Sequence, residues 1–158
     1  MTHPVTDPDR ARPRVLIATG NAKKLKEMAE LLQDPRWELV SMADFPDANA
    51  EVEETGATYE ENAIIKAVAA CRATGLVAIA DDAGLEIDAL DGAPGLRSRR
   101  FLGEDVPFEA KMRRILEMLA DVPDTGRGCR FRAAVAIAVP NGDVRICRGV
   151  CEGMVARE

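Results

Sequence analysis

Residues 76–84, LVAIADDAG, decide how this chain folds. The first five of them are apolar on both faces of an extended strand, which is typical of a central strand in a covered sheet. Gly75 precedes this run, and the pair Asp81 and Asp82 follows it directly. The stretch therefore predicts a buried strand that ends at residue 80 and enters an acidic turn.

Strands and helices alternate outward from this segment in both directions. Short apolar or alternating runs predict further strands over 14–18, 37–42, 85–88, 131–139 and 144–150. In the run 131–139 one face is largely alanine, which permits close packing. The tetrapeptide PNGD at 140–143 indicates a hairpin turn between the last two strands.

Three helices are predicted from apolar residues at helical spacing. The first lies between Asn21 and Asp34. The second runs over 58–74, with Thr58 and Glu61 as a capping box and Gly75 as the C-terminal turn. The third covers 108–119. This order predicts an α/β fold, a mixed central sheet with flanking helices, in one domain over 14–158.

Composition narrows the class of partner. The 158 residues carry 21 Lys and Arg against 27 Asp and Glu, a net charge of −6, which disfavours binding to a nucleic acid backbone. The net charge does not exclude a small anionic substrate that is held by a few local cations. No apolar run approaches the roughly 20 residues that span a bilayer, so no membrane partner is expected. Residues 1–13 lack the apolar core of a secretion signal and predict a disordered tail, with a cytoplasmic location.

Cysteine and histidine usage limits the chemistry. The four cysteines, at 71, 129, 147 and 151, form no C-x-x-C pair, and the single histidine is His3. A zinc site is therefore disfavoured, and reduced, mostly buried thiols are expected. Nucleophiles activated by histidine are also disfavoured, so the chemistry must rest on carboxylates, lysines or a metal.

The segment 19–24, TGNAKK, is the first candidate site. A strand, a glycine turn and a helix start present backbone N–H groups at the positive end of the helix dipole, where phosphate binds. Gly20 allows close approach, while Asn21 and Lys24 can donate to phosphate oxygens. The segment is not a Walker A loop. The alternative is an ordinary strand-to-helix turn in which Asn21 caps the helix.

Acidic residues form the second candidate. Two adjacent carboxylates, Asp81 and Asp82, repel each other unless a cation or solvent relieves them, and Mg²⁺ prefers such oxygen ligands. One carboxylate could bind metal while the other accepts a proton from water. The loop 51–56, EVEETG, could supply another. Lys66, in the helical segment 62–67, is a further candidate. The alternatives are a solvated turn, a solvated loop and a lysine that reaches the surface.

The combination and order of these motifs are more specific than each alone. TGN-x-x-K after the first strand, E-E-T-G, E-N-A-x-x-K-A on a helix and A-D-D-x-G-L follow one another. Further along come GAPG at 92–95, Ser98 and the 131–139 strand. Together they resemble the inosine triphosphate pyrophosphatase (ITPase) family. That family hydrolyses inosine, deoxyinosine and xanthosine triphosphates to monophosphate and pyrophosphate.

The resemblance implies a role for each matching residue. Asp82 would be the general base and also a metal ligand, and Glu54 and Asp81 would complete a Mg²⁺ site. The triphosphate and its surroundings would be contacted by Thr19, Gly20, Asn21, Ala22, Lys23, Lys24, Lys66 and Ala83. The resemblance also implies a two-lobed fold with a long central sheet, a homodimer and a purine nucleoside triphosphate as substrate.

The chain departs from the family pattern in two places. Ala83 stands where the family usually has serine, so weakened substrate binding is expected. The family also continues beyond the equivalent of Glu158 with a glycine-rich F-G-Y-D segment, a lysine and an S-H-R motif. An ITPase-like fold lacking its C-terminal part is therefore expected, with an unpaired sheet edge. Two other interpretations are a catalytically impaired nucleotide-binding or dimerisation fragment, and a pyrophosphatase that prefers pyrimidine or modified nucleotides.

Overall fold

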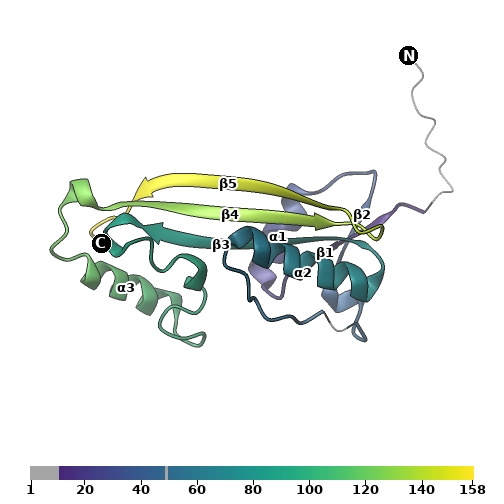
Figure 1. The fold of residues 1–158 in the computed structure, drawn as a ribbon, viewed down its shortest axis with the longest axis horizontal. Coiled ribbons are helices and arrows are strands. Elements are labelled where there is room, and N and C mark those ends of the chain that lie inside the picture. The colour runs from purple at the N-terminus through teal and green to yellow at the C-terminus, as the bar shows by residue number, and fades with distance from the viewer. Residues whose placement is uncertain (1–10, 49) are drawn as a thin grey trace, which may run out of the picture.

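The computed structural model describes residues 11–48 and 50–158 and contains a long mixed sheet flanked by helices (Figure 1). The five strands are β1 (Arg14–Ile17), β2 (Glu38–Ser41), β3 (Val77–Ile87), β4 (Gly128–Ala138) and β5 (Val144–Met154). The α-helices are α1 (Ala22–Leu31), α2 (Tyr59–Thr74) and α3 (Phe108–Met118). This architecture confirms the predicted α/β fold. Of the predicted tail, residues 1–10 lie outside the described residues, and residues 11–13 are exposed without regular structure.

The strand order in the sheet is β2-β1-β3-β4-β5. β1 pairs in parallel with both β2 and β3, whereas β3, β4 and β5 are antiparallel neighbours. β5 therefore forms one edge of the described sheet, and nearly all of its residues are exposed. Among the described residues no helix is long and apolar enough to cross a membrane.

β3 differs from its prediction. The strand does not end at residue 80, and no separate strand begins at 85, because β3 pairs with β4 without interruption from Ala78 to Ile87. The antiparallel partner supplies ladder hydrogen bonds across both aspartates and keeps them extended. β1 pairs with β3 only as far as Ile79. The acidic pair therefore lies in mid-strand, where β3 loses its parallel neighbour.

Two separate cores lie on opposite faces of this sheet. Successive residues of a strand point to opposite faces. Ala78 and Ala80 pack with Ala134, Ala136 and several small residues of α2, which confirms the predicted close packing of the alanine face. The second core is built from Ile87, Ile115, Leu119 and Cys129. Figure 1 shows α2 and α3 at opposite ends of the long strands, so the sheet joins two lobes.

Cysteine burial follows the same arrangement. All four cysteines are free, and Cys71 and Cys129 are buried in the two cores. Cys147 and Cys151 are exposed because they lie on the edge strand β5. The expectation of mostly buried thiols is therefore wrong for two of the four.

Both ends of α2 are fixed by local interactions. The Thr58 hydroxyl oxygen accepts a hydrogen bond from the Glu61 N–H at 3.1 Å, as the capping box predicts. The reciprocal bond is made one residue earlier than predicted, since the Glu61 carboxylate accepts from the Ala57 N–H at 2.6 Å. Gly75 ends the helix at φ 71°, in the left-handed region that suits glycine.

Gly84 packs closely against Tyr59 and Gly95, and we expect Gly84→Ala to destabilise the fold. A Cβ at this position would lie 2.6 Å from the Tyr59 hydroxyl and would overlap the carbonyl oxygen of Gly95. Overpacking of this kind typically costs about 1–3 kcal/mol of unfolding free energy, which urea denaturation measures. Gly149→Ala on β5 is the matched control, because nothing lies within 4 Å of its added Cβ. Equal losses in the two variants would contradict this account.

Candidate active site

The turn between β1 and α1 is organised by Asn21. Its Oδ1 accepts hydrogen bonds from the Lys23 N–H at 3.0 Å and the Lys24 N–H at 3.3 Å. Its own N–H donates to the Thr19 hydroxyl at 3.2 Å. Asn21 is thus the cap of α1, as the alternative interpretation held. Open space surrounds Gly20, and Gly20, Ala22 and Lys23 are exposed, so a ligand can reach the turn.

Lys24 connects this turn to β3. Its Nζ lies 2.6 Å from Asp81 Oδ2, and the Asp81 side chain is only 14% exposed. The backbone reinforces the connection, because the Ala18 N–H donates to the Ile79 carbonyl at 2.8 Å. The structure therefore brings the TGNAKK turn and the first of the two aspartates together.

Asp82 is buried at 9% exposure and is held by α2. Its Oδ2 accepts from the Asn62 side-chain amide at 3.0 Å, and its Oδ1 accepts from the Ala83 N–H at 3.1 Å. Lys66 Nζ lies 3.8 Å from Asp82 Oδ1 and 3.1 Å from Glu54 Oε1. The Lys66 ammonium is therefore ion-paired and does not simply extend into solvent. The Glu54 carboxylate is likewise paired and not only solvated.

The two aspartates face opposite sides of the sheet, because neighbouring residues of a strand alternate. Asp82 faces α2, and Asp81 meets Lys24 of α1. Of the three predicted metal ligands, the geometry thus groups Glu54 with Asp82 around Lys66, and pairs Asp81 with Lys24. No cluster of three or more acidic, cysteine or histidine side chains suited to a metal occurs within residues 11–48 and 50–158.

Two carboxylates that converge on one positive charge still fit Mg²⁺. This ion is usually bound by one or two carboxylates, with substrate phosphates and waters completing its coordination. Glu54 and Asp82 meet that requirement, since both already lie close to the Lys66 ammonium. The donor set is therefore suited to a metal that arrives together with a phosphorylated substrate.

Burial shapes the acidity of Asp82. Desolvation raises the pKa of its carboxyl above the ordinary value, and the nearby Glu54 raises it further. The hydrogen bond from Asn62, the Lys66 charge and the Ala83 N–H oppose this effect. A carboxylate with a raised pKa and several fixed partners is a candidate for accepting a proton from water.

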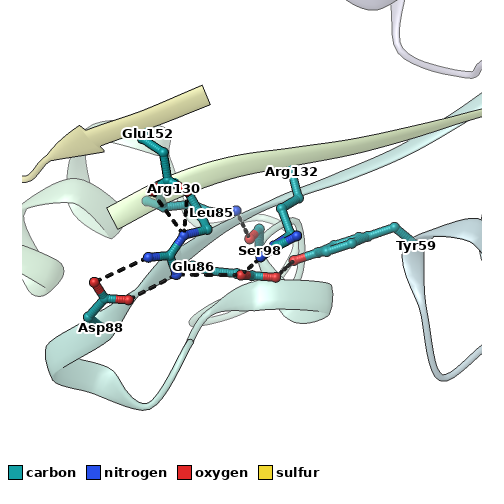
Figure 2. A network of polar contacts seen from close by, with 8 residues as sticks. All are labelled: Tyr59, Leu85, Glu86, Asp88, Ser98, Arg130, Arg132 and Glu152. Carbon is teal, nitrogen blue, oxygen red and sulfur yellow. Dashed lines mark hydrogen bonds and ion pairs between the residues drawn. The ribbon is translucent and has the colours of Figure 1, made fainter. Parts of the chain in front are cut away.

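A second polar network lies further along β3 (Figure 2). The Tyr59 hydroxyl, at the start of α2, donates to Glu86 at 3.3 Å, and Glu86 also accepts from Arg132 at 2.8 Å. Burial, with the Glu86 charge, raises the Tyr59 pKa to about 12, so the hydroxyl stays a donor at neutral pH. The network ends in Asp88, Arg130 and Glu152. It fixes the start of α2 against the far half of β3.

Asn62 is the site residue that the sequence interpretation missed. It lies inside the E-N-A-x-x-K-A motif, four residues before Lys66. Residues at that spacing lie on the same face of a helix. The spacing therefore could have indicated that Asn62 faces the same carboxylates as Lys66.

Comparisons with known proteins agree with this fold and motif order. The Ham1 family model matches residues 15–158. A dITP/XTP pyrophosphatase of Desulforamulus reducens is 48% identical over 145 residues, which are 92% of this chain and 72% of that protein. One from Shigella flexneri is 44% identical over 147 residues, 92% of this chain and 74% of that protein.

A solved structure extends the likeness to three dimensions. A HAM1 protein from Coxiella burnetii superimposes with a TM-score of 0.81 at 40% sequence identity, covering 92% of this chain and 74% of that one. The family model and the curated relatives each match more than nine-tenths of the chain. The resemblance inferred from the motifs is thereby confirmed, and the chain belongs to the Ham1 family.

Proposed function

We propose that this chain hydrolyses ITP, dITP and XTP to the nucleoside monophosphate and pyrophosphate, and so removes non-standard purine nucleotides. The observation that carries this function is the position of Lys66 between Glu54 and Asp82. Such a site combines cations for phosphates with carboxylates for a metal and for water. The names of the relatives, dITP/XTP pyrophosphatases at 48% and 44% identity, support the same chemistry.

Asp82 acts as the general base. It accepts a proton from a water that attacks the α-phosphorus, and the bond from that phosphorus to the bridging oxygen breaks, releasing pyrophosphate. Glu54 and Asp82 would hold Mg²⁺, which would neutralise charge on the phosphates. Lys66 donates to the phosphates from beside these two carboxylates. Asp81 supports the metal site only indirectly, by holding Lys24.

The β1–α1 turn binds the triphosphate. Asn21 already occupies two amides of the first helical turn, so it shapes the turn while phosphates use the remaining donors of residues 19–24. Lys24 adds a charge from the edge of this turn. Ala83, next to Asp82, offers a substrate only its backbone and methyl group. The active form is a homodimer, as in the family that the motifs indicate.

Product analysis tests this function. We expect pyrophosphate release from ITP, dITP and XTP with Mg²⁺ to exceed release from ATP by at least about 10-fold, the discrimination that one lost hydrogen bond provides. Removal of divalent metal with EDTA should abolish release. Orthophosphate as the first product would contradict the proposal. Nucleotide binding without turnover would instead favour the impaired nucleotide-binding fragment.

A further inference from the structure

One buried amide joins the two segments that carry the acidic residues of the site. Asn62 is 4% exposed, and its side chain makes two hydrogen bonds in opposite directions. Its Nδ2 donates to Asp82 Oδ2 at 3.0 Å, and its Oδ1 accepts from the Gly56 N–H at 2.8 Å. Gly56 lies two residues after Glu54. The same side chain therefore contacts the strand of one carboxylate and the loop of the other.

The bridge needs a short side chain that both donates and accepts. A carboxylate at residue 62 could accept from Gly56 but could not donate to Asp82, and an apolar side chain could do neither. The partners also assign the orientation of the amide, because its NH₂ group must face the Asp82 carboxylate and its oxygen the N–H. Gly56 packs closely here, since a Cβ on it would lie 2.6 Å from Asn62 Oδ1.

The loop has few other attachments between Glu54 and α2. Thr58 and Glu61 hold its last residues through the first turn of the helix. Glu54 itself is held by Lys66 at 3.1 Å. Asn62 is thus a contact that keeps the loop beside Asp82 without occupying the space between the two carboxylates.

We propose that Asn62 is a positioning residue, which sets the separation of Glu54 and Asp82 and so prepares the opening that receives the divalent cation. This inference rests on the proposed function for its link to catalysis. Groups that orient metal ligands without touching the metal commonly change metal affinity or activity by about 10- to 100-fold when they are removed. A merely structural Asn62 would change stability alone.

The test compares Asn62→Leu, which keeps the volume but removes both hydrogen bonds, with Ala70→Gly as the control. Ala70 is buried on the same helix, about two turns beyond Asn62, so its replacement weakens α2 without breaking the bridge. Three quantities are measured: amide hydrogen exchange of residues 54–57, binding of Mn²⁺ alone by electron paramagnetic resonance, and the Mg²⁺ concentration for half-maximal pyrophosphate release.

We expect Asn62→Leu to speed exchange over 54–57 and to weaken Mn²⁺ binding and raise the Mg²⁺ requirement about 10-fold or more. Ala70→Gly should change the melting temperature and leave all three quantities close to wild type. If Asn62→Leu moved them no further than Ala70→Gly does, the inference would be overturned. Asn62→Ala replaces Asn62→Leu if the leucine variant does not fold. Should the wild-type chain release no pyrophosphate, the proposed function fails, while exchange and Mn²⁺ binding still decide the role of Asn62.

Discussion

Asp82→Asn should lower the rate of pyrophosphate release by about 10²- to 10⁴-fold, the usual contribution of a general base. The amide keeps the shape of the carboxylate, and its oxygen can still accept from Asn62, but it can neither take a proton nor bind a cation as strongly. Steady-state release from ITP with saturating Mg²⁺ measures the effect. Asp81→Asn is the matched control, because Asp81 faces Lys24 on the other side of β3. A smaller loss in Asp82→Asn than in Asp81→Asn would refute the assignment of the base.

The same substitution should not unfold the protein, and the direction of its effect on stability follows from the pKa. Burial raises the pKa of Asp82 in the folded chain. A carboxyl with a raised folded pKa lowers stability at pH above both of its pKa values, because its charged form is held at a cost. Relative to wild type, Asp82→Asn should therefore gain free energy of unfolding as pH rises from 3.8 toward neutrality. The gain should vanish as pH falls below the ordinary carboxyl value of 3.8.

Arg127→Met should be the most destabilising of the substitutions considered, with a loss of about 3–5 kcal/mol in the free energy of unfolding. Arg127 is 2% exposed. Its guanidinium donates to the carbonyls of Leu119 at 2.6 Å, Val155 at 3.0 Å and Ala156 at 2.8 Å. Methionine fills similar space but removes all three hydrogen bonds, and each hydrogen bond that involves a charged group contributes about 1.5–3 kcal/mol.

Arg132→Met is the control for that measurement. Arg132 lies in β4, the strand that begins directly after Arg127, but its side chain is 45% exposed and pairs with Glu86 near the surface. Ion pairs of this kind contribute about 0–1 kcal/mol. Urea denaturation of both variants should therefore separate them clearly. Comparable losses would mean that the carbonyl contacts of Arg127 contribute little.

Local signals in the sequence were enough to predict much of the fold. The Thr58 cap and the Gly75 stop lie inside the segment they delimit, so α2 could be bounded without any tertiary information. The end of β3 could not be predicted in this way. The hydrogen-bonded ladder with β4 carries β3 through the two aspartates, and the β4 residues lie some fifty positions later in the sequence. Charged residues in mid-strand resemble a turn until their partner strand is known.

The candidate site was likewise predictable from local signals only in part. Two lysines and three carboxylates were predicted as one group, and their contacts form two separate sets. Lys24 pairs with Asp81, whereas Lys66 lies beside Glu54 and Asp82. The separation of Asp81 from Asp82 was missed, because it follows from strand alternation and the pair had been assigned to a turn. Asn62 was missed because a single amide in a helix carries no signal until its two distant partners are placed.

The unbroken course of β3 also restricts how this family member can change over evolutionary time. Losing or gaining one residue between Val77 and Asp81 would shift every later side chain by one position and exchange the sides to which the two aspartates point. The base would then meet Lys24, and its neighbour would enter the space beside Lys66. Loops that carry no residue of the site can change length without this consequence, whereas one residue more or less in β3 would part the base from its neighbours.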